Sequence, residues 1–346
     1  MTTIDTPQTS RASALWLTTV AIVILAMVVV GGATRATGSG LSITQWQPVR
    51  GVIPPLTREA WERLFALYRT TPQYRLVNAG MSLAQFQHIF WWEWAHRLLG
   101  RVLGVVFFGP FFLLLALRRL PRRLVVRCII LFALGGLQGL VGWRMVQSGL
   151  AGRTSVAPEW LALHQGTALL LLMAILWTAL EAWRGPPAAG QGSAAWRRVG
   201  VALLASVYVQ CLLGALVAGN HAGLVDADWP LMAGRVFPSD YWQGSLWSTL
   251  VRGAAAVQFN HRILAYLLLA AGQVVAFASL RRDAASLRPL AVAIAGLLIL
   301  QVGLGIATLL LTAPLALALL HQFTAVSLLA AATAFAWQTR RIRQVL

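Results

Sequence analysis

The sequence has 346 residues, of which 58% are hydrophobic and 11% are charged, and runs of roughly twenty apolar residues recur along it. This composition excludes an ordinary soluble globular protein and predicts an all-α integral membrane protein. The formal charge of +18 comes from arginines that lie in the gaps between the apolar runs, as the positive-inside rule predicts, so it gives no support to nucleic-acid binding.

The apolar runs predict eight transmembrane helices. We expect them at residues 15–34, 87–117, 124–146, 160–183, 198–219, 256–280, 289–311 and 315–337. The first run follows a polar amino terminus without a small-residue cleavage site, which predicts a retained helix and not a signal peptide. The arginine-rich short connections place both termini in the cytoplasm. Cys128 and Cys211 lie inside predicted spans and are expected to be small core residues.

Two long loops, at residues 35–86 and 220–257, lie on the opposite side and are rich in Gly, Pro and Trp. Loops of this length are usually functional or disordered. In the first loop, apolar residues recur at helical spacing after Thr57, namely at Trp61, Leu64, Phe65 and Tyr68. This pattern predicts a short amphipathic helix that lies on the membrane surface or covers a site.

The first four spans and the last four carry the same marks in the same order. Gly40, Leu41, Trp46, Gly51 and Pro55 recur as Gly223, Leu224, Trp229, Gly234 and Pro238 at one constant offset. The motif HRLL at 96–99 recurs as HRIL at 261–264, and LHQ at 163–165 recurs as LHQ at 320–322. Gln138 with Gly142 recurs as Gln301 with Gly305.

This repeat predicts two four-helix bundles in the same orientation, related by an axis along the membrane normal. We expect a cytoplasmic tail at residues 1–14, an N-terminal bundle at 15–183, a linker at 184–198, a C-terminal bundle at 199–337 and a second cytoplasmic tail at 338–346.

Four of the six histidines recur through the repeat at one depth, in the non-cytoplasmic third of their spans: His96, His164, His261 and His321. Each bundle therefore holds two. Imidazoles from neighbouring helices commonly bind a haem iron from both sides, whereas zinc would be expected to recruit further ligands that do not recur here. His88 and His221 fall outside the repeat, and we interpret them as interfacial or loop residues.

Charged residues adjoin the histidines. Arg97 and Arg262 each follow a ligand candidate and are expected either to pair with haem propionates or to reach the lipid headgroups. Glu93 lies three residues before His96 and shares its helix face, but Gln258 takes its place in the second half. Only the first bundle therefore offers a carboxylate, which predicts that Glu93 serves proton chemistry at a reacting haem and not the fold.

The chain resembles the haem A synthase family of cytochrome oxidase biogenesis over nearly its whole length. The resemblance is carried by GSGLSIT at 38–44, Trp46, Pro48, GVIPP at 51–55, FWWEWAHR at 90–97, LHQ at 163–165, WPLM at 229–232, NHR at 260–262 and HQ at 321–322. Some members also have a cysteine pair in the first long loop, and this chain has none there.

The resemblance implies oxidation of the C8 methyl group of haem O to the formyl group of haem A. It implies that His261 and His321 ligate a resident haem b, that His96 and His164 belong to the substrate haem site, and that Glu93 matches a carboxylate important for activity. It also implies an inner-membrane location, with haem O synthase as a partner that supplies the substrate. The electron acceptor, the oxygen source and any homo-oligomer stay open.

Two other functions fit the same pattern. A di-haem cytochrome that only moves electrons, for instance from quinol, would use the same histidine pairs. A haem carrier would fit the parallel repeat but explains fixed ligand pairs less well. The difference between Glu93 and Gln258, together with two long loops able to cover a porphyrin, favours the synthase.

Overall fold

The computed structural model describes residues 10–47, 49–185, 193–281 and 284–341. Eight of its helices are long and apolar enough to cross a membrane, which confirms the eight predicted spans and the all-α membrane class. They are α1 (Arg11–Ala36), α4 (Leu83–Ala116), α5 (Arg122–Leu150), α6 (Pro158–Arg184), α7 (Ala194–Gly219), α8 (Ala254–Ala278), α9 (Arg288–Leu310) and α10 (Leu315–Thr339). Most of the predicted tails and linker lies outside the described residues.

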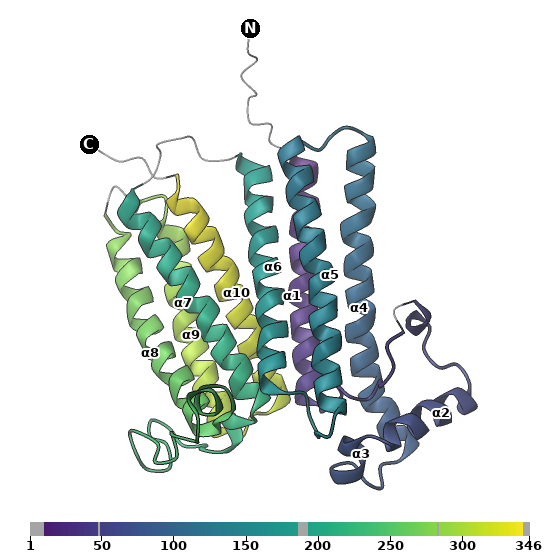
Figure 1. Cartoon of the computed structure of the whole chain (residues 1–346). Helices are drawn as coiled ribbons and strands as arrows, with labels where there is room; N and C mark the ends of the chain where they lie inside the picture. The colour runs from purple at the N-terminus through teal and green to yellow at the C-terminus, as the bar shows by residue number, and fades with distance from the viewer. Residues whose placement is uncertain (1–9, 48, 186–192, 282–283, 342–346) are drawn as a thin grey trace.

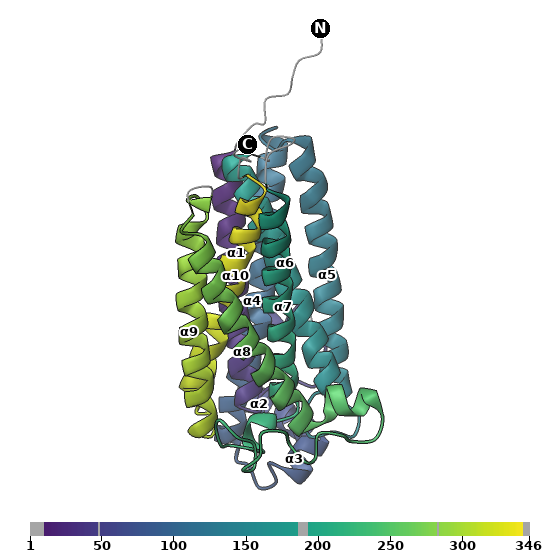
Figure 2. The same cartoon turned by 90° about the vertical axis from the view of Figure 1, so that its left-hand side faces the viewer.

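The long helices form two groups (Figure 1), with α1, α4, α5 and α6 in one and α7 to α10 in the other. In the second group each helix packs on the next to close a ring, α7 on α8, α8 on α9, α9 on α10 and α10 on α7. In the first group α1 packs on α4 and α6, and α6 packs on α5. Helix α6 packs on α7 and α10, and α1 packs on α10, which joins the two groups. Figure 2 shows the molecule from the side of the second group.

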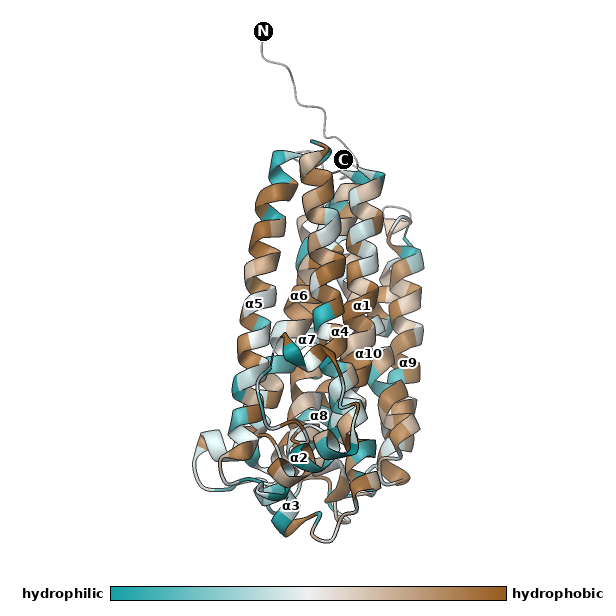
Figure 3. Cartoon of the chain, turned by 90° about the vertical axis from the view of Figure 1, so that its right-hand side faces the viewer, coloured by the Kyte–Doolittle hydropathy of each residue, from teal (hydrophilic) through white to brown (hydrophobic). Residues whose placement is uncertain are grey.

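The long loops gather at one end of the bundle, opposite the arginine-rich turns (Figure 1). They contain α2 (Arg58–Arg69), α3 (Pro72–Leu76) and the single turns η1 (Arg50–Val52), η2 (Ala222–Leu224) and η3 (Ser248–Arg252). Hydrophobic residues dominate the spans, and hydrophilic ones gather toward the ends and in α2 and α3 (Figure 3). A membrane between these ends leaves both long loops on one side of it.

The predicted amphipathic helix is α2, and it packs on protein. Thr57 accepts a hydrogen bond from the backbone N–H of Ala60 as its N-cap. At 34 residues, α4 is about 50 Å long and exceeds a hydrocarbon core of about 30 Å, so its first turns reach past the membrane. There Trp61 of α2 meets Phe90 of α4 with ring centroids 4.8 Å apart. The helix therefore covers the end of α4.

The main apolar core lies toward the arginine-rich end, away from the predicted ligand histidines. It includes Leu17 on α1, Leu172 on α6 and Phe335 on α10, each 2% exposed or less. All four of these histidines are only partly buried, although they lie on spans. Packing of apolar side chains thus stabilises one half of the bundle, and the four histidines of the other half are only partly buried.

Two contacts join the groups near the histidine level. Arg35, at the end of α1, donates hydrogen bonds to the carbonyl of Ala218 at 2.7 Å and to Nε2 of His221 at 2.8 Å. Burial, and to a smaller extent the Arg35 guanidinium, lowers the pKa of His221, which favours the neutral imidazole that can accept this bond. On α10, Gln322 Nε2 donates to the carbonyl of Val28 at 3.1 Å. His221 therefore helps to hold the groups together.

Candidate haem-binding site

Each of the four recurring histidines lies against a glycine of the neighbouring odd-numbered span of its half. A Cβ on Gly31 would lie 2.6 Å from Cε1 of His96, and one on Gly142 would lie 2.8 Å from Cε1 of His164. The same distance is 3.2 Å for Gly214 with His261 and 3.1 Å for Gly305 with His321. A Cβ at Gly31 or Gly142 would force the ring to shift, whereas at Gly214 or Gly305 the ring would have to give by a few tenths of an ångström. Glycine therefore lets each imidazole lie close to the neighbouring helix backbone.

Three of the four histidines are also held by a glutamine one turn before that glycine. Gln138, Gln210 and Gln301 donate from Nε2 to the backbone carbonyls of His164, His261 and His321 at 2.9, 2.9 and 3.0 Å. The same nitrogen lies 3.0 to 3.4 Å from a ring nitrogen of each histidine. Thr167 and Thr324 donate to the amide oxygens of Gln138 and Gln301. Such outer partners orient a ligand ring.

In the second group, His261 and His321 face each other with ring centroids 6.5 Å apart and planes at 77°. Two imidazoles that bind one metal ion from opposite sides, through bonds of about 2 Å, place their centroids roughly 6 Å apart. His321 Nδ1 is buried and has no hydrogen-bond partner among the described residues. The spacing, the donor set and the glycine contacts therefore fit a bis-histidine haem iron.

In the first group, His96 on α4 and His164 on α6 lie near each other. No cluster of three or more His, Cys, Asp or Glu side chains suited to a metal ion forms within the described ranges. The histidines therefore come as pairs, and a pair of imidazoles suits haem better than a zinc ion that needs further ligands.

Glu93 is 4% exposed and binds the loop that follows α1. Its Oε2 accepts hydrogen bonds from the Ser42 hydroxyl and the backbone N–H of Ile43, both at 2.7 Å. Its Oε1 accepts from Arg97 Nε at 3.1 Å and Nη2 at 2.6 Å. A carboxylate has about four lone-pair sites, so all of its acceptor positions are used. Glu93 thus ties the loop to α4 directly beside His96.

The second half makes the same attachment with reversed polarity. Gln258 Nε2 donates to the loop carbonyls of Ala222 at 3.0 Å and Asp226 at 3.1 Å. Arg262 donates to the carbonyls of Asp226 and Leu231, both at 2.9 Å. The exchange of Glu93 for Gln258 therefore accompanies a loop that offers carbonyls in place of donors.

Both arginines expected near haem propionates are engaged with the loops. Arg97 donates to the carbonyls of Ile43 at 2.7 Å and Gln45 at 3.0 Å besides its pair with Glu93. Arg262 makes the two loop contacts given above. These hydrogen bonds attach each loop to its span at the residue that follows a ligand candidate. Contact of the two arginines with propionates stays a prediction.

The sequence pattern missed the roles of the glutamines. The spacing of Gln138 to Gly142 and of Gln301 to Gly305 was visible as a repeat, but the third case, Gln210 with Gly214, was not recognised. A search of every odd-numbered span for Gln four residues before Gly would have found it. The signal is the spacing itself, because residues one helical turn apart share a helix face, and the glutamine therefore lies beside the same histidine as the glycine.

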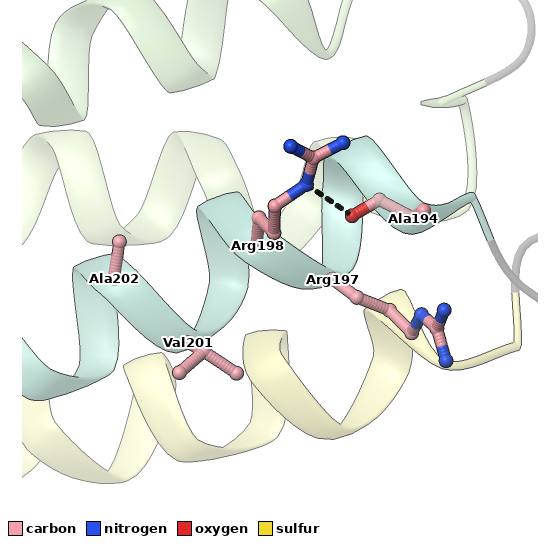
Figure 4. Close-up of a pocket in the computed structure, with 5 residues that line it drawn as sticks. All are labelled: Ala194, Arg197, Arg198, Val201 and Ala202. Atoms are coloured by element: carbon pink, nitrogen blue, oxygen red, sulfur yellow. Dashed lines mark hydrogen bonds between the residues drawn. The ribbon is translucent and has the colours of Figure 1, made fainter.

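A shallow groove of about 700 Å³ lies at the other end of the molecule, on the outside of α7 (Figure 4). It is lined by Ala194, Arg197, Arg198, Val201 and Ala202. Arginines at the end of a span are typical of the headgroup level, so this groove is separate from the histidine pairs.

Comparison with known proteins points to one family. A family model described as cytochrome oxidase assembly protein matches residues 14–333. The chain is 55% identical over 334 residues to the heme A synthase of Caulobacter sp. (strain K31), an alignment that covers 96% of this chain and 97% of that protein. It is 54% identical to the heme A synthase of Caulobacter vibrioides and 44% identical to that of Maricaulis maris, each over 96% of this chain and 97% of the relative.

Proposed function

The chain belongs to the cytochrome oxidase assembly protein family, and on that premise we propose that it is a haem A synthase. It is then a multi-pass membrane oxidoreductase that uses haem and oxidises the C8 methyl group of haem O to the formyl group of haem A. The observation that carries this proposal is the 55% identity to a heme A synthase over nearly the full length. The paired histidines support a location for this activity beside them.

We propose that the second pair, His261 and His321, holds a resident haem b. Their 6.5 Å separation and glutamine contacts support a fixed ligand pair. When bound there, haem b supplies electron transfer to or from the neighbouring site. The protein's own part is to hold both rings still, through Gly214 and Gly305 beneath them and Gln210 and Gln301 beside them.

We propose that the first pair, His96 and His164, receives the substrate haem. For Glu93 we propose a positioning role, supported by its four hydrogen bonds: the carboxylate holds Arg97 and the start of the long loop over the site. A covered site limits the access of water to the methyl group being oxidised. Haem O must be supplied by farnesylation of haem b, so we expect a haem O synthase to act before this enzyme.

Analysis of the haems made in cells tests the proposal. Membranes from cells that co-express this chain with a haem O synthase should contain haem A after extraction and chromatography. Membranes from cells that express only the haem O synthase should contain haem O. A different result would support a di-haem cytochrome or a carrier instead. In that case the purified chain would hold haem b, but the membrane extract would contain haem O and no haem A.

The glycine contacts predict a sharp difference between two alanine variants on α5. Gly142→Ala should displace His164, because the new Cβ would lie 2.8 Å from its ring, and should lower haem A formation roughly 10- to 100-fold. Gly136→Ala is the matched control, since nothing lies within 4 Å of its new Cβ. The ratio of haem A to haem O in membranes measures haem A formation by each variant. Equal output from the two variants would contradict the role of Gly142.

We further propose an inner-membrane location with both termini in the cytoplasm, supported by the arginine-rich turns at the end of the bundle opposite the long loops. Reporter fusions after Gly51 should be active outside the cytoplasm, and fusions after Gly185 should be active inside it. The reverse pattern would contradict the predicted orientation, because both histidine pairs would then lie near the cytoplasm.

A further inference from the structure

Three of the four ligand histidines are braced by a glutamine, and the fourth is not. In α7, Gln210 lies four residues before Gly214, the glycine beneath His261. In α1, the residue four positions before Gly31 is Met27. The offset of 183 residues that relates Gly40 to Gly223 also relates Met27 to Gln210 and Gly31 to Gly214. Met27 therefore stands where the repeat has a glutamine.

Methionine cannot replace the brace, because its thioether has no hydrogen to donate. The Met27 methyl group instead lies near Gly100 of α4, one turn beyond His96, at 3.4 Å from where a Cβ on that glycine would be. Within the part of the chain that the structure describes, no hydrogen bond reaches the His96 imidazole. Glu93 and Arg97 are hydrogen-bonded to the loop and to each other, and do not supply the missing brace.

Among the described residues, His96 thus has the close glycine, Gly31, without a glutamine, whereas its partner His164 has both. Removing an outer partner of a ligand typically weakens metal binding roughly 10- to 100-fold. Of the four candidate ligands, His96 is the one without such a partner among the described residues. His96 lies in the bundle where, on the proposed function, haem must be exchanged at every turnover.

We propose that Met27 makes His96 the exchangeable ligand of the first pair, so that haem O enters and haem A leaves there while the haem of the second pair stays bound. This inference rests on the proposed function and adds to it a positioning residue and a reason why the two bundles treat haem differently. His164, braced by Gln138, keeps a fixed side of the site, and His96 provides the side that opens.

A reciprocal exchange of the two residues tests this. Met27→Gln gives the first pair the brace, and Gln210→Met removes it from the second. The purified full-length protein is loaded with haem O and mixed with excess apomyoglobin as a haem acceptor. Chromatography of the haem that remains separates haem O from haem b, so each pair is followed on its own and no turnover is needed.

The unaltered protein should lose haem O faster than haem b. Met27→Gln should slow the loss of haem O, and Gln210→Met should speed the loss of haem b, each by roughly 10- to 100-fold. Met173→Gln makes the same chemical change at a partly buried position of α6, nine residues past His164, and should alter neither rate.

Loss of haem O from Met27→Gln at the unaltered rate, in a protein that keeps its haem b, would overturn the inference. Should Met27→Gln fail to fold, Gln210→Met decides, since an unchanged rate of haem b loss would equally overturn it. Failure of the proposed function is read separately, as absence of haem A from cells that express the unaltered chain. In that case the rates of haem b loss still report whether the glutamine holds a ligand.

Discussion

Replacing both His261 and His321 with alanine should remove the resident haem b from the purified protein. The two rings face each other at 6.5 Å, and among the described residues no further metal-binding side chain gathers beside them to take their place. Loss of haem should exceed the roughly 10- to 100-fold weakening that follows removal of an outer partner, because here the ligands themselves are lost. Haem content per protein and the absorption spectrum measure the result.

His88→Ala is the control, because His88 is an exposed histidine on α4 outside the repeat and should leave haem content unchanged. The pair His96→Ala and His164→Ala should keep haem b and lose haem A formation. Full haem b with unchanged absorption in the double variant of His261 and His321 would refute the assignment of the second pair.

The spans and the candidate ligands could be read from the sequence for different physical reasons. A helix that crosses the hydrocarbon core of a membrane needs about twenty apolar residues, so local composition is enough to predict the spans. The histidines stand out because a duplicated bundle repeats its ligands at one depth, as His164 and His321 show with identical LHQ neighbours. Neither inference needs knowledge of how helices pack.

The contacts around the histidines could not be read in the same way, because they join residues far apart in the chain. Glu93 and Ser42 are 51 positions apart, and no local pattern reports that the loop folds back onto α4. The charge difference from Gln258 was visible, and it suggested chemistry at Glu93. The structure relates this charge difference to the loops. The first loop presents hydrogen-bond donors to Glu93, and the second presents carbonyls to Gln258.

The final prediction concerns Glu93→Gln, which removes the charge and keeps the size of the side chain. An amide leaves the partly buried Arg97 guanidinium without its carboxylate, and leaving such a hydrogen-bonded partner unpaired costs about 1–3 kcal/mol. The loop should then detach from α4, and haem A output should fall roughly 10²-fold, as expected when a positioning group moves by about 1 Å. Trypsin cleavage after Arg50 and Arg58 in the loop, measured beside haem A output, reports both effects.

Ser42→Ala separates this positioning role from proton transfer, because it removes one of the four donors to Glu93 and leaves every charge in place. Under the positioning role it should produce a smaller version of both effects, since the lost buried hydrogen bond costs about 1–3 kcal/mol. Under proton transfer, Glu93→Gln would stop haem A formation by roughly 10²- to 10⁴-fold with a loop as resistant to trypsin as before, and Ser42→Ala would stay near normal. That second pattern would restore the chemical role predicted from the sequence, because a saturated carboxylate can accept a proton only when one of its donors leaves. Near-normal haem A output from Glu93→Gln would remove Glu93 from both roles.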